Sequence, residues 1–150
     1  MFFYEVITGR FYHRVTTKTG ENDVLLGTGY SGADGITKNN PEYQDIHDEG
    51  PIPQGYWDIT GPPIDTSTHG PFVLHLFPEV NTSVFGRSGF LIHGDSVLHP
   101  GKASEGCIIM PLATRQAIWA ACQATGDHRL RVIDKFSDPS DTKDQKGDLV

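Results

Sequence analysis

The chain has 150 residues, an ordinary length for one domain with a single hydrophobic core. Its formal net charge is -7, and its 12 Lys and Arg residues form no cluster, so a nucleic-acid-binding face is not expected. The sequence has no run of about 18 apolar residues, which excludes a membrane-spanning helix.

Composition and pattern favour a mainly β domain of short strands. Apolar residues make up 37% of the chain, and 17 Gly and 10 Pro residues supply many turns. The alternation of apolar and polar residues, with turn residues between the runs, predicts strands over residues 2–7, 10–16, 23–30, 55–60, 72–78, 90–93, 107–110 and 129–134.

The connections follow from the turn residues. Thr8 and Gly9 are typical of a two-residue hairpin turn between the first two strands. Residues 37–53 are polar and contain prolines, so we expect an ordered surface loop that borders a cleft. Gly61-Pro62-Pro63 is expected to end the strand before it, because proline cannot donate to a β-ladder.

One helix is predicted, over residues 112–125. Leu112, Gln116 and Trp119 have helical spacing, and Gly126 is a typical stop. The chain is therefore interpreted as one domain over residues 1–136, and the charged segment 137–150 as a mobile tail.

A pair of residues in the middle of the chain indicates a nucleophilic cysteine. Cys107 lies in the run Ser104-Glu105-Gly106-Cys107, and His93 ends an apolar run fourteen residues earlier. A thiol attacks a carbonyl as thiolate and needs a neighbour that takes its proton, for which His93 is the candidate. Gly106 permits a sharp turn, so the N–H groups of Gly106 and Cys107 are candidate oxyanion donors. The alternative, a small buried cysteine with a packing role, is less consistent with this pairing.

These motifs resemble a known family. Phe90-Leu91-Ile92-His93-Gly94-Asp95 and Ser104-Glu105-Gly106-Cys107-Ile108 are similar to the His-Gly and Ser-x-Gly-Cys signature of L,D-transpeptidase (YkuD-like) catalytic domains, and residues 50–57 resemble a segment at the start of a central strand of those domains. The three elements occur in the expected order and cover roughly residues 50–112. The resemblance implies a β-sandwich or barrel with one main helix after the catalytic cysteine.

Two departures from the family pattern point to one of its branches. Those domains usually carry Arg two residues after the cysteine, where it meets a substrate carboxylate, and this chain has Ile109. They also commonly carry His or Arg before the motif glycine, and this chain has Glu105. In both respects the chain more closely resembles the L,D-transpeptidase-like toxins that type VI secretion delivers into competing bacteria. The resemblance implies a peptidoglycan stem peptide as substrate, a cognate immunity protein and a secretion-machine carrier as partners, and no cofactor.

Roles can be assigned under this hypothesis. Cys107 attacks the carbonyl after the third residue of a stem peptide to give a thioester, and His93 accepts the thiol proton and later protonates the leaving amine. In the resembling family a backbone carbonyl holds the second imidazole nitrogen, so Asp95 is either a helper or a turn residue. Ser104 either donates a hydrogen bond near the imidazole or substrate, or shapes its loop.

Four further residues are candidate substrate contacts, each beside a simpler interpretation. His99 is an alternative base or a turn residue, and His75 either projects into the site from a neighbouring strand or packs on that strand. Arg87 and Lys102 either replace the missing arginine or are solvated charges. Cys122 is interpreted as a buried structural residue of the helix, and no His or Cys spacing indicates a metal site.

Localisation and two alternatives complete the sequence-based predictions. The chain starts without the basic and apolar segments of a signal peptide, which suits a protein made in the cytoplasm and exported by a contractile machine to act in the periplasm of target bacteria. A non-catalytic murein-binding or secretion-associated module with the same fold is the first alternative. A papain-like or NlpC/P60 hydrolase is disfavoured, because only His128 follows Cys107 along the chain. Carboxypeptidase cleavage, D-amino-acid exchange and cross-linking differ only in the acceptor, so all three stay open.

Overall fold

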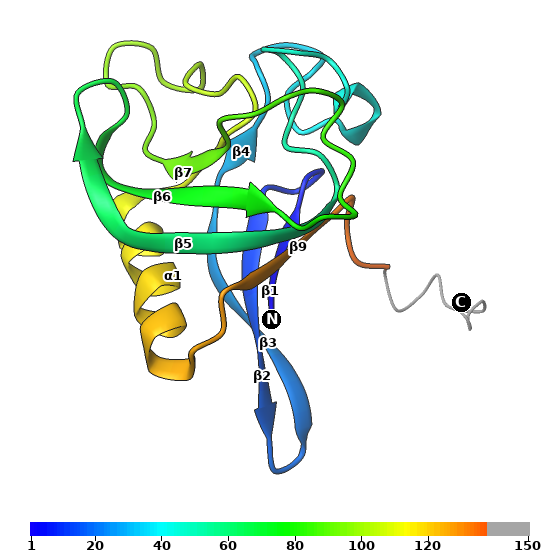
Figure 1. Ribbon diagram of the computed structural model, residues 1–150, viewed down its shortest axis with the longest axis vertical. Coiled ribbons are helices and arrows are strands. Elements are labelled where there is room, and N and C mark those ends of the chain that lie inside the picture. Colours follow the sequence, from blue (N-terminus) through cyan, green and yellow to red (C-terminus); the bar gives the residue numbers. More distant parts are fainter. Residues whose placement is uncertain (138–150) are drawn as a thin grey trace.

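The computed structural model describes residues 1–137 and confirms a mainly β fold with one main helix after Cys107 (Figure 1). The strands are β1 (Phe2–Glu5), β2 (Arg10–Thr17), β3 (Gly20–Thr28), β4 (Tyr30–Ser31), β5 (Gly55–Thr66), β6 (Gly70–Pro78), β7 (Leu91–His93), β8 (Ile108–Ile109) and β9 (Arg129–Ile133). The helix α1 spans Leu112–Thr125, as predicted, and a short 3-10 turn, Pro41–Tyr43, lies in the segment expected to form a loop. The predicted mobile tail lies, apart from residue 137, outside the described residues.

The strands form one sheet whose two edges are consecutive in the chain. Its order is β3-β2-β1-β9-β5-β6-β7-β8-β4, with parallel pairing of β1 with β9 and of β7 with β8. Only Gly29 separates β3 at one edge from β4 at the other, so the sheet curls until its edges meet. A Cβ atom at Gly29 would lie 1.7 Å from the carbonyl oxygen of Ile109, so this junction requires glycine.

The core fills the inside of the curled sheet, and α1 contributes to it. Alternate strand residues point inward, as in β9, where Leu130 and Val132 are buried between exposed arginines. The helix adds Ile118 and Cys122, and the burial predicted for Cys122 is confirmed by its complete exclusion from solvent. The largest fully buried side chains are Trp57, Tyr4, Phe2, Phe11, Ile52, Ile59, Leu74, Ile92, Ile108, Met110, Ile118 and Leu130.

The expectation that Gly61-Pro62-Pro63 ends a strand is wrong. β5 continues to Thr66, and its register with β6 shifts between Thr60 and Ile64 and again before Thr66. The prolines lie in this irregular stretch, where the ladder does not require their missing N–H groups. A Cβ atom at Gly61 would lie 2.4 Å from the ring of Trp119, so α1 packs directly on the irregular stretch. β5 therefore bends, and its end rises toward the level of β7 (Figure 1).

The strand expected over residues 23–30 begins earlier than predicted, where it forms a hairpin with β2, and it is interrupted near its end. β3 begins at Gly20, and the cross-strand pair Arg14 and Asp23 forms a bidentate ion pair with an Nε–Oδ1 distance of 2.7 Å. The break falls at Gly29, and Tyr30 and Ser31 form the separate strand β4. Among residues 1–137 the only α-helix has 14 residues and is neither long nor apolar enough to cross a membrane.

Candidate active site

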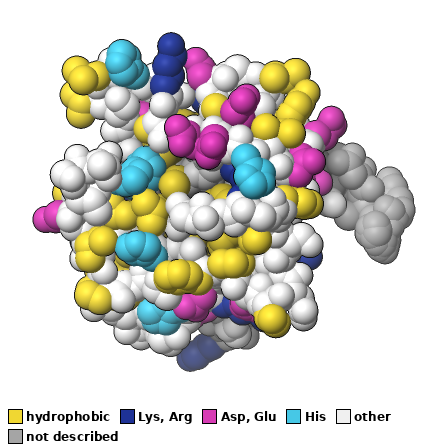
Figure 2. All heavy atoms as spheres, turned by 45° about the horizontal axis from the view of Figure 1, so that its top comes forward, with side chains coloured by type: hydrophobic (Ala, Val, Ile, Leu, Met, Phe, Trp, Pro, Cys, Tyr) yellow, Lys and Arg dark blue, Asp and Glu magenta, His cyan; other side chains and the backbone are white. Residues whose placement is uncertain are grey.

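The register of β7 and β8 brings Cys107 and His93 to one wall of a cleft. The two strands are parallel, with Ile92 beside Ile108, and both of these isoleucines point into the core. Cys107 directly precedes Ile108 and His93 directly follows Ile92, so alternation turns both side chains to the opposite face. Both line a cleft of about 930 Å³. Figure 2 shows histidine and acidic side chains around a hollow on this side of the molecule.

His93 is held as a neutral imidazole with one nitrogen bonded to the backbone. Its Nδ1 lies 2.8 Å from the carbonyl oxygen of Gly94, and because a carbonyl only accepts, we assign the proton to Nδ1. Burial lowers the pKa of His93 to about 4, and the neighbouring His69 and Arg115 act in the same direction, whereas the bond to Gly94 and the charge of Asp95 raise it in part. Near pH 7 the ring is therefore uncharged, and its Nε2 carries a lone pair that can accept a proton.

The thiol of Cys107 is also neutral at rest. Its Sγ donates to the carbonyl oxygen of Gly89, 3.7 Å away, in a weak hydrogen bond. Burial raises the pKa of Cys107 to about 11, the backbone N–H of Leu91 and the charge of Arg87 lower it in part, and Glu105 raises it. The arrangement therefore pairs an uncharged thiol with an uncharged base, and a thiolate forms only when a proton leaves during reaction.

Ser104 shapes the loop that carries Cys107. Its side chain is buried, and its Oγ accepts from the N–H groups of Gly32 at 2.9 Å and Gly106 at 3.1 Å. The same hydroxyl donates to the carbonyl oxygen of Cys107 at 2.7 Å, so it is committed to the backbone and not to an imidazole. Because the Gly106 N–H is taken up by Ser104, the expectation that it serves as an oxyanion donor does not fit this geometry. The Cys107 N–H remains the candidate.

Arg87 is buried beneath the same loop, at the lining of the cleft, and donates four hydrogen bonds to carbonyl groups. Its Nη1 donates to Gln44 and Pro51 at 2.6 and 2.8 Å, and its Nη2 donates to Gly50 and Glu105 at 2.8 and 3.1 Å. The guanidinium thus ties the segment over residues 44–51, which the sequence predicts as an ordered loop, to the cysteine loop. A contact between Arg87 and substrate, as expected from sequence, would compete with all four bonds.

Gly106 lies where this arginine approaches most closely. Its φ is 138°, a backbone conformation that favours glycine, and a Cβ atom would lie 2.5 Å from Nη2 of Arg87. Glycine before the cysteine is therefore required both by the turn and by the packing of the guanidinium.

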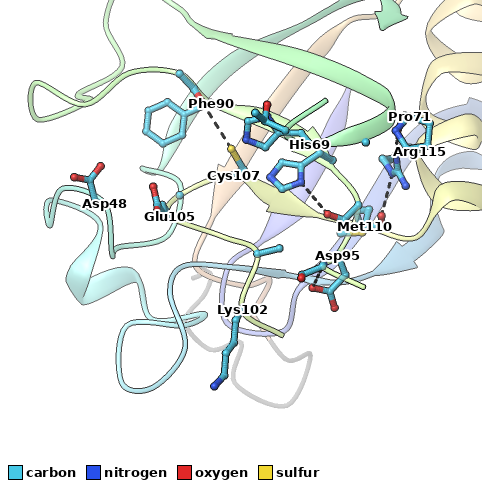
Figure 3. Close-up of a pocket in the computed structure, with 18 of the residues that line it drawn as sticks. Asp48, His69, Pro71, Phe90, Asp95, Lys102, Glu105, Cys107, Met110 and Arg115 are labelled. Atoms are coloured by element: carbon cyan, nitrogen blue, oxygen red, sulfur yellow. Dashed lines mark hydrogen bonds between the residues drawn. The ribbon is translucent and has the colours of Figure 1, made fainter. Parts of the chain in front are cut away.

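Asp95 is a turn residue in this structure. Its carboxylate accepts from the hydroxyl of Tyr30 at 2.6 Å and from the N–H groups of Ser96 and Gly101 at 2.8 and 3.1 Å. Burial alone would raise the pKa of Asp95, but these hydrogen bonds outweigh it and lower the pKa. The carboxylate orders the loop after β7 and lies beside the cleft that this loop borders (Figure 3).

The remaining candidates from sequence lie at the rim or outside the cleft. Lys102 lines the rim, is exposed, and has its Nζ 4.0 Å from a carboxylate oxygen of Asp34. His99 is exposed and does not line the cleft. His75 stacks on Phe77 on β6 with ring centroids 6.2 Å apart, and it also does not line the cleft.

Arg115 of α1 was not predicted and lines the cleft. It is only 4% exposed, its Nε donates to the carbonyl of Met110 at 3.0 Å, and its Nη1 donates to those of Pro71 and Phe72. Within residues 1–137 no acidic side chain forms an ion pair with it and no acceptor binds its Nη2, which lies against Gly94. One feature of the sequence could have indicated this position: Arg115 lies on the same helical face as Ile118, where apolar residues are expected.

His69 is the second residue that sequence reasoning missed. It lies in the turn between β5 and β6, lines the cleft, and has its ring centroid 4.6 Å from that of His93 at an interplanar angle of 57°. Figure 3 shows His69 with Cys107 and Arg115 around the cleft. Nothing in a polar turn sequence distinguishes this histidine, because its position depends on the bend of β5, which the packing of Trp119 on Gly61 accompanies. Among residues 1–137, no group of three or more His, Cys, Asp or Glu side chains could hold a metal ion.

In this mainly β fold, His93 ends β7 and Cys107 directly precedes the parallel strand β8, so the two residues of the L,D-transpeptidase-like signature lie together at one cleft. A family model described as the Tlde1 domain matches residues 27–131, which include both His93 and Cys107. The chain belongs to this family of type VI L,D-transpeptidase-like effectors, and the resemblance found in the sequence is confirmed. No curated protein and no solved structure shows a significant match to the chain.

Proposed function

We propose that this effector domain is a cysteine enzyme that removes or exchanges the terminal D-amino acid of peptidoglycan stem tetrapeptides. The observation that carries the proposal is the register of β7 and β8, which gives the Cys107 thiol and an uncharged His93 the same wall of the cleft. Family membership supports an L,D-transpeptidase-like effector that is delivered into target cells, with an immunity protein as partner.

The chemistry proceeds through a thioester. As Sγ of Cys107 bonds to the substrate carbonyl carbon, the thiol proton moves to Nε2 of His93, and the carbonyl oxygen becomes an oxyanion near the Cys107 N–H. Collapse of this intermediate breaks the C–N bond, and His93 returns the proton to the leaving amine. Water or a D-amino acid then attacks the thioester, gives a proton to His93, and the thiol is restored when that proton passes to sulfur.

Arg115 supports a substrate that carries a carboxylate. A buried cation without an anionic partner is costly, and a ligand carboxylate at its unoccupied Nη2 would offset that cost. The terminal residue of a tetrapeptide has such a carboxylate next to the scissile bond. Arg115 therefore takes the recognition role that the family pattern gives to the residue at Ile109 and that sequence alone suggested for Arg87 and Lys102.

Mass spectrometry of purified tetrapeptide muropeptides tests the reaction. We expect wild-type protein to release the terminal D-alanine, or to exchange it for an added D-amino acid, and Cys107→Ser to do neither. Cys122→Ser is the matched control, since Cys122 is fully buried in the core and should be dispensable for turnover. Equal turnover by Cys107→Ser would contradict the proposal.

The effector role has its own test. Expression of the wild-type chain in the bacterial periplasm should arrest growth, cytoplasmic expression should not, and co-expression of the cognate immunity protein should restore growth. A Cys107→Ala form as toxic as wild type would rule out the catalytic version.

A non-catalytic murein-binding module is the second candidate. The observation in its favour is that burial opposes the charged forms of both Cys107 and His93, so no ion pair exists at rest. This candidate predicts that wild type and Cys107→Ser bind isolated sacculi equally well and that neither changes the muropeptides.

A further inference from the structure

We propose that His69 is a positioning residue of this site, which packs on the ring of His93 and holds that ring where it can accept a proton. The proposal rests on the proposed role of His93 as the base. It concerns a contact between two histidines that are 24 residues apart and that no motif connects.

The contact is close and lies at the cleft. The two ring centroids are 4.6 Å apart, and both residues line the cleft, with His93 only 3% exposed and His69 half-buried. At this distance His69 covers part of the imidazole of His93 and limits its rotation, while the bond from Nδ1 to Gly94 fixes the opposite side. The ring of His93 is thus held from two elements, β7 and the turn between β5 and β6.

The turn that carries His69 is itself ordered by side chains. The His69 N–H donates to Oγ1 of Thr66 at 2.8 Å, and the Oγ1 of Thr68 lies 3.0 Å from Nδ1 of the imidazole. Beyond the turn, the N–H of Phe72 donates to the carboxylate of Asp65 at 3.1 Å. The irregular stretch at Gly61 bends β5 so that this turn reaches the level of β7, which gives the glycine and prolines a role in building the site (Figure 1).

Charge gives the contact a chemical consequence. The charged and titratable groups that act on His93 are His69 from the turn, Arg115 from α1 and Asp95 from the loop after β7, and the thiol of Cys107 lines the same cleft. A positive charge on His69 or Arg115 makes a proton on His93 less favourable, whereas Asp95 and the bond to Gly94 favour it.

The test compares two substitutions that separate packing from charge. His69→Phe keeps a ring against His93 and removes any charge of the imidazole, and His69→Ala removes both the ring and the charge. The pH midpoint for protonation of the His93 imidazole is measured by NMR in proteins that also carry Cys107→Ala, so this measurement does not require catalysis. We expect the midpoint to rise by about one unit in both variants, as removal of a neighbouring positive charge predicts.

The same two variants with Cys107 intact are assayed on muropeptides from acidic to neutral pH. We expect the acid limb of the kcat/KM profile to move to higher pH in both, and kcat at pH 7 to fall severalfold only in His69→Ala, where the ring contact is lost. An unchanged His93 midpoint in both folded variants would overturn the proposal. If the His93 midpoint shifts but the protein with wild-type His69 and Cys107 shows no muropeptide turnover, the histidine contact is retained and the proposed enzyme function is refuted.

Discussion

The hydroxyl of Ser104 donates to the carbonyl oxygen of Cys107 over 2.7 Å, so the residue that begins the motif holds the backbone of the residue that ends it. The Oγ of Ser104 also accepts from the N–H groups of Gly32 and Gly106, which links the cysteine loop to the chain just after β4. One buried atom therefore fixes both the turn before the thiol and the wall behind it.

Ser104→Ala should impair both stability and catalysis. The change leaves two N–H groups and a carbonyl without their partner in a buried loop, so we expect the free energy of unfolding to fall by about 2–3 kcal/mol. A displaced thiol should lower kcat/KM by at least about tenfold. Urea unfolding and muropeptide turnover measure the two effects. Ser96→Ala is the control, because the Ser96 hydroxyl accepts from one exposed N–H, and its effects should be small.

Arg115→Gln should weaken recognition of a carboxylate while leaving the thiol in place. We expect kcat/KM for a tetrapeptide with a free terminal carboxylate to fall by about tenfold or more, as loss of a charge-assisted hydrogen bond predicts. The informative comparison is the same peptide with a terminal amide. If Arg115 binds the carboxylate, wild type should prefer the acid over the amide, and Arg115→Gln should lose most of this preference. An equal acid-to-amide ratio in both proteins would contradict this role.

The buried neutral state of His93 makes stability depend on pH. Its folded pKa of about 4 lies below the ordinary value of 6.5, so between these values the unfolded chain binds more protons and folding weakens as pH falls. Between pH 7 and pH 4.5 this contribution amounts to a loss of about 2 kcal/mol. Urea unfolding at both pH values should show that the free energy of unfolding falls by about 2 kcal/mol more in wild type than in His93→Gln. An equal fall in the two proteins would indicate that the imidazole is solvated and would contradict the prediction.

Tyr4→Phe should stabilise the protein. Tyr4 is fully buried, and among the described residues its hydroxyl has no hydrogen-bond partner, so deleting that oxygen removes an uncompensated cost of about 1 kcal/mol. We expect a Tm higher by a few degrees in a thermal scan, with turnover unchanged. Tyr30→Phe is the contrasting variant, since the Tyr30 hydroxyl donates to Asp95 and accepts from Ala103, and it should lower Tm.

Local patterns predicted much of the fold. The helix over residues 112–125 is indicated by residues at helical spacing and by the glycine that follows it, and most strands follow from alternation of apolar and polar residues over a few positions. The pairing of Cys107 with His93 was also accessible, because His93 ends one apolar run before a glycine, Cys107 begins another after a glycine, and the two belong to a family signature.

What the sequence did not predict depends on contacts between distant segments. Gly61-Pro62-Pro63 has the composition of a strand end, and only the packing of Trp119 on Gly61 shows why the strand continues through it. Arg87 and Arg115 look alike as isolated charges, but one is saturated by four carbonyls and the other keeps an unoccupied nitrogen at the cleft. Such differences arise from tertiary structure, which no local pattern encodes.

The junction at Gly29 also makes the site depend on pairing between distant parts of the chain. β4, which follows this junction, pairs with β8 through Tyr30 and Ile109, which lie far apart in the sequence. Contacts between such distant residues form slowly, because a long loop must close first. β8 directly follows Cys107 and also pairs with β7, so the strand that β4 must find is the one that brings the thiol to the wall that carries His93. A chain in which β8 is not yet in place would therefore have no assembled site.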